Sequence, residues 1–217
     1  MVKPVNIHHI REWLKTKPVG QAFQPAIHYP EIQSLKKEHL QSVHFFRRRL
    51  PHWELQGFTC FVTFRVCFGS EKPLLKSILA SLVEESLWFG HGQRYALEAY
   101  VIMPDHVHLL IQPINGWGLS KIMQGLKGFT AREINKVLGR KGSFWQDENF
   151  DHLIRNERDW LDKLDYIHTN PVKAGLVDKP QDYPFSSMVT LYSRGRLESL
   201  EGETVCVADR NVCHTAE

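Results

Sequence analysis

Two segments that favour β-strands follow one another with almost nothing between them. The first, RYALEAYVIM at residues 94–103, and the second, HVHLLIQP at residues 106–113, are rich in aromatic and β-branched residues. Only Pro104 and Asp105 separate them. A parallel pair would need a crossover of about a dozen residues or more. We therefore predict that the two segments pair as an antiparallel hairpin.

The hairpin is flanked by segments whose patterns predict further elements. Residues 58–68, FTCFVTFRVCF, are typical of a largely buried strand. Apolar residues recur at helical spacing in residues 74–89 and again in residues 119–138, before Gly139. A third helix is expected from residue 157 onward. The order strand, helix, hairpin, helix, helix predicts an α+β fold, with helices on one face of an antiparallel sheet.

Length and composition fit one domain with extensions. The chain has 217 residues, is 42% hydrophobic and carries a net charge of +3. We assign residues 1–46 to an N-terminal extension, 47–192 to the main domain and 193–217 to a loose polar tail. The four cysteines form no Cys-x-x-Cys pair, which favours reduced thiols. No apolar run approaches the roughly 20 residues that cross a bilayer, so we expect a cytoplasmic protein without a membrane partner.

His106 and His108 lie two residues apart within a predicted strand. Side chains alternate along a strand, so both imidazoles should point to the same face and Val107 to the other. Imidazole nitrogens are common ligands of transition metals, and a rigid strand holds two of them at a fixed separation. An isolated pair of this kind is more often two hydrogen-bonded histidines, and the spacing leaves both interpretations open.

Tyr166 and Asn170 are separated by one helical turn and should share one side of the third helix. We expect that helix to end at Asn170, because Pro171 disfavours helical geometry in the residue before it. An amide oxygen can be a third ligand of a divalent ion, and a tyrosine beside such an ion is a candidate nucleophile. A packed tyrosine and an asparagine that ends a helix would give the same pattern.

Four segments in a fixed order, with a fifth upstream, give the chain a family resemblance. Residues 47–187 resemble the REP-associated tyrosine transposases, which are relatives of the single-tyrosine transposases of small insertion sequences. The matching segments are YVIMPDHVHLLIQP, LSKIMQGLKGFTAREIN, FWQDENFDHLIR and DYIHTNPVKAGLV, with RRRLPHWELQGFTCFVTFRV upstream. The resemblance implies a ferredoxin-like antiparallel sheet with helices.

The resemblance also implies a reaction. It indicates that His106 and His108 bind Mg²⁺ or Mn²⁺, that Asn170 completes the metal site and that Tyr166 becomes joined to a DNA 5′ phosphate. The chain would then be a metal-dependent endonuclease and strand transferase, a transposase that acts on single-stranded or hairpin DNA. A monomer and a homodimer are both compatible with the sequence.

Basic and aromatic residues supply candidate DNA contacts. Trp145 is a candidate for stacking on unpaired bases, although a core position is the commoner role for tryptophan. One departure from the family is Asn149-Phe150, where an aromatic pair is frequent, so that no second tyrosine competes with Tyr166 in that segment. Basic residues that could follow a phosphate backbone, or lie on a solvated surface, are Arg47, Arg48, Arg49, Lys127, Arg132, Lys136 and Arg140.

Two other functions compete with the transposase. A domesticated hairpin-binding protein could keep the fold without meaningful turnover, although the complete set of candidate site residues argues against decay. A histidine-triad nucleotide hydrolase would need a third alternating histidine, and Leu110 stands at that position. Neither the DNA sequence that is recognised nor the metal used in the cell can be read from the residues.

Overall fold

The computed structural model describes residues 36, 44–47, 51–54, 57–67 and 72–189. Its centre is a four-stranded antiparallel sheet with the strand order β4-β5-β3-β6. The elements that build it and cover it are β3 (Cys60–Arg65), α2 (Ser77–Gly90), β4 (Tyr95–Ile102), β5 (His106–Pro113), α3 (Leu119–Leu138), β6 (Phe150–Leu153) and α4 (Glu157–Lys173). The succession β-α-β-β-α-β with this strand order is a ferredoxin-like sheet, as the sequence predicts. The tight connection between β4 and β5 forms the expected hairpin.

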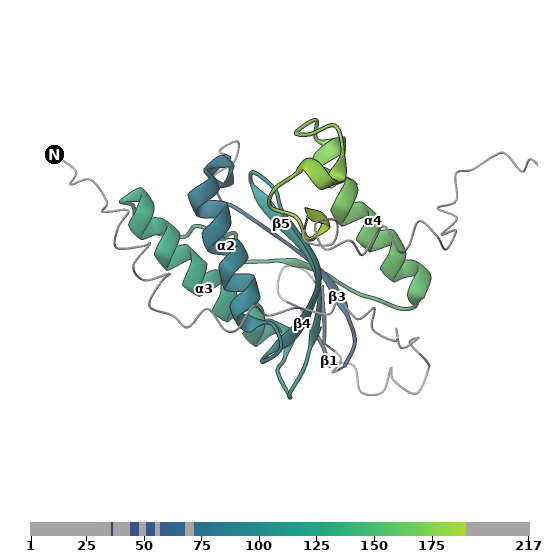
Figure 1. Cartoon of the computed structure of the whole chain (residues 1–217). Helices are drawn as coiled ribbons and strands as arrows, with labels where there is room; N and C mark the ends of the chain where they lie inside the picture. The colour runs from purple at the N-terminus through teal and green to yellow at the C-terminus, as the bar shows by residue number, and fades with distance from the viewer. Residues whose placement is uncertain (1–35, 37–43, 48–50, 55–56, 68–71, 190–217) are drawn as a thin grey trace, which may run out of the picture.

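The helices lie on both faces of the sheet, which corrects the expectation of a single covered face. Figure 1 shows α2 and α3 on one side of the strands and α4 on the other. Alternation along β5 explains the two layers. Val107, Leu109 and Ile111 pack toward α2 and α3, whereas Leu110 packs with Ile167 of α4. Because both faces carry apolar residues, a helix on one face alone would leave the other exposed to water.

Helix α4 begins where the sequence predicts and ends later. The Asn156 side chain accepts a hydrogen bond of 3.0 Å from the backbone N–H of Asp159, which caps the first turn. The predicted end at Asn170 is wrong, because the helix continues through Pro171 to Lys173. Pro171 is buried in the last turn, and the N–H of Ala174 still donates to the Asn170 carbonyl at 2.9 Å. The missing N–H of one proline is therefore tolerated near the helix end.

Two buried polar residues connect α4 with the sheet, Glu98 directly and His168 through Ser187, whose hydroxyl is hydrogen-bonded to the backbone of Tyr100 in β4. Glu98 of β4 accepts hydrogen bonds from the Thr59 hydroxyl at 2.6 Å and from the Trp160 indole N–H. Burial raises the pKa of Glu98, although both hydrogen bonds act in the opposite direction. His168 shares a hydrogen bond of 2.9 Å with the Ser187 hydroxyl, and burial lowers the pKa of His168 to about 4. These contacts hold the helix in one rotation about its axis.

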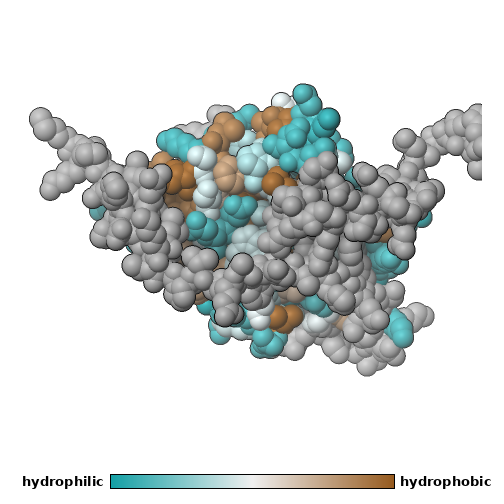
Figure 2. Space-filling view, viewed as in Figure 1, coloured by the Kyte–Doolittle hydropathy of each residue, from teal (hydrophilic) through white to brown (hydrophobic). Residues whose placement is uncertain are grey.

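A separate hairpin precedes the main sheet. Strands β1 (His44–Arg47) and β2 (Pro51–Glu54) pair antiparallel, and β2 lies beside β6. Strand β1 crosses the boundary that the sequence suggests between residues 46 and 47. The described residues do not include most of the N-terminal extension or the tail from residue 193. None of the helices in the described part of the chain is long and apolar enough to span a bilayer. On the face in Figure 2, hydrophobic residues form small patches among hydrophilic ones.

Candidate active site

The two histidines of β5 project to the same face of the sheet, as strand alternation predicts, and this is the face that α4 covers. Their ring centroids lie 4.6 Å apart, with the planes inclined by 74°. His108 is buried and His106 is partly buried. The opposite orientation of Val107, in the core under α2 and α3, confirms the predicted alternation. The pair is thus a rigid feature of a central strand.

Each imidazole is hydrogen-bonded through Nδ1. Nδ1 of His106 lies 2.6 Å from Oδ1 of Asp105, whose other oxygen accepts from Arg65 at 2.8 Å. Nδ1 of His108 lies 2.7 Å from the hydroxyl of Thr63. A carboxylate can only accept, so His106 donates from Nδ1 and keeps its lone pair on Nε2. His108 has the same tautomer when the Thr63 hydroxyl accepts. Both Nε2 atoms then keep a lone pair that can bind a ligand.

Burial keeps both rings neutral near pH 7. It lowers the pKa of His106, although the neighbouring Asp105 carboxylate acts in the opposite direction. Burial, reinforced by His106 and Arg65, lowers the pKa of His108 to about 3. Burial acts to raise the pKa of Asp105, but the hydrogen bonds and charge interactions with Arg65 and His106 together lower it. Neutral imidazoles beside an ionised carboxylate are the protonation states that metal binding requires.

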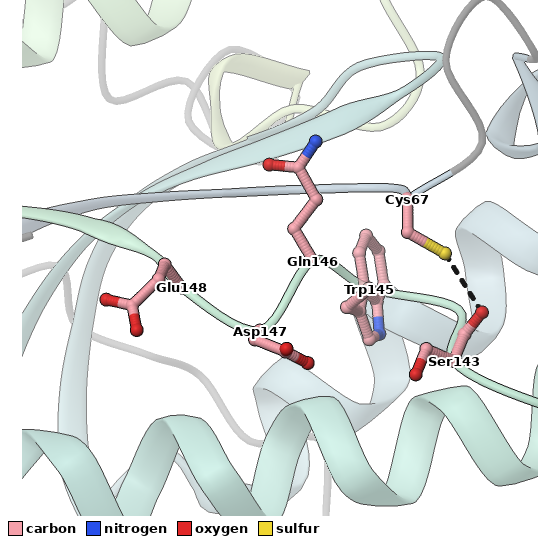
Figure 3. A pocket seen from close by; sticks show the side chains of 6 residues that line it. All are labelled: Cys67, Ser143, Trp145, Gln146, Asp147 and Glu148. Carbon is pink, nitrogen blue, oxygen red and sulfur yellow. Dashed lines mark hydrogen bonds between the residues drawn. The ribbon is translucent and has the colours of Figure 1, made fainter. Parts of the chain in front are cut away.

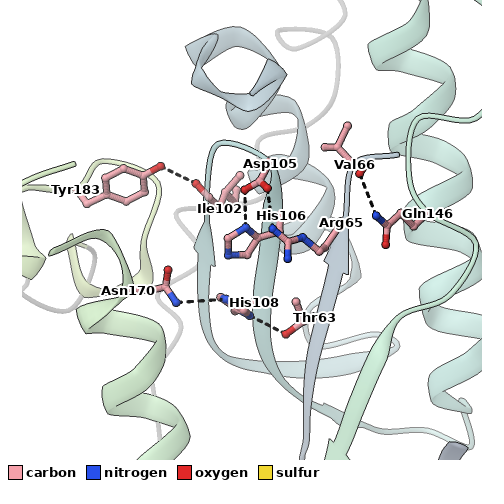
Figure 4. Close-up of polar contacts among 10 residues, drawn as sticks. All are labelled: Thr63, Arg65, Val66, Ile102, Asp105, His106, His108, Gln146, Asn170 and Tyr183. Carbon is pink, nitrogen blue, oxygen red and sulfur yellow. Dashed lines mark hydrogen bonds and ion pairs between the residues drawn. The ribbon is translucent and has the colours of Figure 1, made fainter. Parts of the chain in front are cut away.

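Helix α4 brings the two remaining predicted residues to the histidines. Nδ2 of Asn170 lies 3.4 Å from Nε2 of His108, and Figure 4 shows the amide reaching from α4 toward the imidazole, with Thr63 on the opposite side. The ring centroid of Tyr166 lies 5.1 Å from that of His108. Tyr166 remains 40% exposed, so its hydroxyl-bearing ring is accessible to a large substrate. All four residues that the sequence singled out therefore meet at one place.

The donors at this place suit a divalent cation of the Mg²⁺ or Mn²⁺ type. Two imidazole nitrogens and the carbonyl oxygen of the Asn170 amide would be the ligands, which requires the amide to rotate because its nitrogen faces His108 here. The remaining coordination positions would be left to water or substrate. No group of three or more histidine, cysteine or acidic side chains with metal-binding geometry occurs among the described residues. The Asn170 amide would be the candidate for a third protein ligand, because the Asp105 carboxylate is already engaged by Arg65 and His106.

Those predicted DNA-contacting residues whose side chains the structure describes are not gathered around the histidines. Arg132 and Lys136 lie on α3, which covers the opposite face of the sheet. Lys136 pairs with Glu133 at 2.7 Å, and Nζ of Lys127 donates to a backbone carbonyl at 2.8 Å. Arg140 follows the end of α3. Arg47 is the last residue of β1, its side chain is not described, and Arg48 and Arg49 lie outside the described residues.

Two lysines of α4, which the sequence pattern did not single out, lie near the candidate nucleophile. Nζ of Lys163 lies 5.3 Å from the centroid of the Phe61 ring, which packs edge-on against Tyr166. Nζ of Lys173 lies 5.9 Å from the centroid of the Tyr166 ring itself. Their spacing of three and seven residues from Tyr166 could have indicated a shared helix face. Trp145, by contrast, is buried and donates from its indole nitrogen to Thr130 at 2.8 Å, so it is a core residue.

A hollow of about 330 Å³ near the end of β3 is separate from this site. Figure 3 shows Asp147 and Glu148 at one end of its lining. At the other end, the Cys67 thiol donates a hydrogen bond to the Ser143 carbonyl. None of the candidate ligands lines it. Its two carboxylates make it unsuited to a phosphate backbone, and we assign it no part in the chemistry.

Known proteins resemble the chain in both sequence and fold. A family model of IS200-like transposases matches residues 74–170. A Haemophilus influenzae protein named as a putative REP-associated tyrosine transposase is 35% identical over 126 residues, which are 52% of this chain and 72% of the relative. The chain belongs to the REP-associated tyrosine transposase family. The resemblance that the motifs indicated is therefore confirmed.

Two further members of the family support the same conclusion. The REP-associated tyrosine transposase of Escherichia coli K12 is 35% identical over 107 residues, 46% of this chain and 59% of the relative. The solved structure of a REP-associated tyrosine transposase bound to a REP hairpin matches with a TM-score of 0.56 and 25% identity. That match covers 69% of this chain and 87% of the solved one. The fold and the family assignment therefore agree.

Proposed function

We propose that this transposase-family chain cleaves and rejoins single-stranded DNA beside a hairpin, with Tyr166 as the nucleophile and with Mg²⁺ or Mn²⁺ held by His106, His108 and Asn170. The observation that carries the proposal is the convergence of these four side chains, with each histidine hydrogen-bonded at Nδ1 and with the Asn170 amide beside Nε2 of His108. The hairpin in the related solved structure supports a folded DNA substrate.

The proposed reaction exchanges one phosphodiester for another. The phenolic oxygen of Tyr166 forms a bond to phosphorus, and the bond from phosphorus to the 3′ oxygen breaks. The phenol loses its proton and the departing oxygen gains one, which leaves a 5′-phosphotyrosine and a free 3′ hydroxyl. Because a diester replaces a diester, a 3′ hydroxyl can reverse the step without ATP. A bound cation supplies charge stabilisation to the phosphoryl oxygens.

The other residues of the site orient the imidazoles and Tyr166, and they supply positive charge for the DNA backbone. Asp105 and Thr63 hold the two imidazoles in fixed orientations. Lys163 and Lys173 add positive charge on the exposed side of α4, where the DNA backbone would approach Tyr166. The rigid attachment of α4 to the sheet holds the phenol close to the histidines, and such positioning is a large part of phosphoryl-transfer catalysis.

A labelled hairpin oligonucleotide with single-stranded flanks tests this function. We expect the wild-type protein with Mn²⁺ to cleave it and to become covalently attached to the 5′ phosphate at the break, and we expect EDTA to stop both. Tyr166→Phe should abolish attachment and keep hairpin binding. Tyr183→Phe is the matched control, because the hydroxyl of Tyr183 is engaged by the Ile102 carbonyl at 2.8 Å.

The alternatives give different results in the same assay. Cleavage by the Tyr166→Phe protein at the wild-type rate would remove the assigned nucleophile. Tight hairpin binding by the wild-type protein without any cleavage would instead identify a domesticated DNA-binding protein, and it would refute the proposed reaction.

A further inference from the structure

An exposed aromatic side chain stands beside the candidate nucleophile. Phe150, the first residue of β6, is 53% exposed at the edge of the sheet. Its ring packs edge-on against Phe61 at 6.5 Å, and Phe61 packs in turn against Tyr166 at 5.8 Å. Large hydrophobic side chains with comparable exposure among the described residues are Leu75, Ile78, Phe89, Phe150, Leu161 and Tyr166. Only Phe150 and Tyr166 of these have described ring contacts with Phe61.

Strand register places Phe150 on the same face as the histidines. Thr63 of β3 is paired with His108 on one side and with Phe150 on the other. Directly paired residues in a sheet point to the same face, so the three side chains form a row. Neighbouring strands are about 4.8 Å apart, so the backbones of His108 and Phe150 are separated by about 10 Å. A nucleotide next to a phosphate bound at the histidines could therefore reach Phe150.

The chemistry of this row suits an unpaired base better than it suits the protein core. A phenylalanine that is half exposed gains little from its own packing, whereas its open ring face can stack on any base. The acidic neighbour Asp151 is buried on the opposite face of β6, and it accepts a hydrogen bond from Asn149 at 3.2 Å. No carboxylate of β6 is therefore directed at the side of the ring where DNA would lie.

We propose that Phe150 is a stacking platform for the unpaired base adjacent to the phosphodiester that Tyr166 attacks. The proposal rests on the proposed function, because it needs single-stranded DNA at the histidine site. Phe150 binds the flank of the substrate and takes no part in bond breaking. It would favour cleavage in unpaired DNA, since a base held in a duplex cannot present its face to the ring.

Fluorescence of 2-aminopurine tests the platform. A hairpin oligonucleotide carries this base at successive positions of its single-stranded flank, and the full-length protein carries Tyr166→Phe so that binding is measured without cleavage. We expect quenching at one flank position. Phe150→Leu should remove the quenching and weaken binding by about 5- to 150-fold, the loss typical of one base-aromatic stack. Phe150→Trp should retain both.

Phe89→Leu is the matched control, because Phe89 has the same exposed fraction of 53% but lies on α2, on the other face of the sheet. It should leave quenching and affinity unchanged. Thermal melting of each variant establishes that it is folded. A hairpin without the single-stranded flank should bind equally well to proteins with and without the Phe150→Leu substitution, since the ring contacts only the flank.

Three results would overturn the platform. The first is 2-aminopurine quenching that is the same in Phe150→Leu as in the protein with Phe150. The second is a loss of quenching and affinity in Phe89→Leu as large as that in Phe150→Leu. The third is a changed sedimentation coefficient of Phe150→Leu, which would identify the ring as a contact between two copies of the chain. The proposed function is tested separately with the active protein. If covalent attachment at Tyr166 persists while Phe150→Leu binds normally, only the platform fails, and if attachment never forms, the proposed reaction fails.

Discussion

Thr63→Val should weaken metal binding without changing the shape of the site. The threonine hydroxyl lies 2.7 Å from Nδ1 of His108, and His108 is only 4% exposed, so no bulk water can replace it. Valine fills nearly the same volume but cannot accept a hydrogen bond. The Nδ1–H of His108 would then have no acceptor, which favours the tautomer protonated on Nε2. That proton would occupy the nitrogen that has to bind the metal.

The expected loss follows from the role of such supporting contacts. Removing a hydrogen-bond partner of a metal-binding histidine typically costs about 10- to 100-fold in affinity, which is about 1.4 to 2.8 kcal/mol. Titration of Mn²⁺ followed by electron paramagnetic resonance measures free and bound ion directly, without DNA. Thr59→Val is the control, because the Thr59 hydroxyl bonds Glu98 and not a candidate ligand. If wild type and Thr63→Val bound Mn²⁺ with the same affinity, Thr63 would not control the tautomer of His108.

Two further predictions concern the same face of the sheet. Asp105→Asn keeps an oxygen that can accept from His106 but loses the charge, so the Mn²⁺ titration should give a loss near 10-fold, smaller than that for Asp105→Ala. Glu98→Ala leaves the Trp160 indole N–H without its acceptor, and urea unfolding should show about 1 to 3 kcal/mol lower stability, with a smaller loss for Glu98→Gln. The pKa of Glu98 is raised above its unfolded value by folding, so the stability of wild type relative to Glu98→Gln should be highest below about pH 4.5. It should fall as pH rises through the folded pKa. A difference in unfolding free energy between the two proteins that is the same at all pH values would contradict this.

Local sequence patterns predicted most of the secondary structure and the hairpin at the centre of the sheet. The short Pro104-Asp105 connection forced an antiparallel hairpin, and α3 ends before Gly139, as the apolar pattern predicts. The φ of 64° at Gly139 is the left-handed conformation that glycine adopts readily at a helix end. The placement of α4 on the second face was not predicted, because the strand segments are apolar on both sides and the residue pattern does not say which helix covers which face. The continuation of α4 through Pro171 depends on burial, which is a tertiary property.

The candidate site was predictable where the residues lie on one element, and less so where they come from several. His106 with His108, and Tyr166 with Asn170, share a strand face and a helix side, and spacing identifies both pairs. Thr63 could not be found in this way, because its contact with His108 depends on the register between β3 and β5. Strand register is set by packing across the whole sheet, and a single sequence does not display it.

The identity of the nucleophile is tested most directly by peptide mapping, using mass spectrometry of the covalent product formed with a hairpin oligonucleotide and Mn²⁺. After nuclease and protease digestion, we predict that the peptide containing Tyr166 carries the remaining nucleotide phosphate, attached through the phenolic oxygen. A protein that cleaves the DNA but carries this mass on another residue, or on none, would contradict the assignment of Tyr166 as the nucleophile.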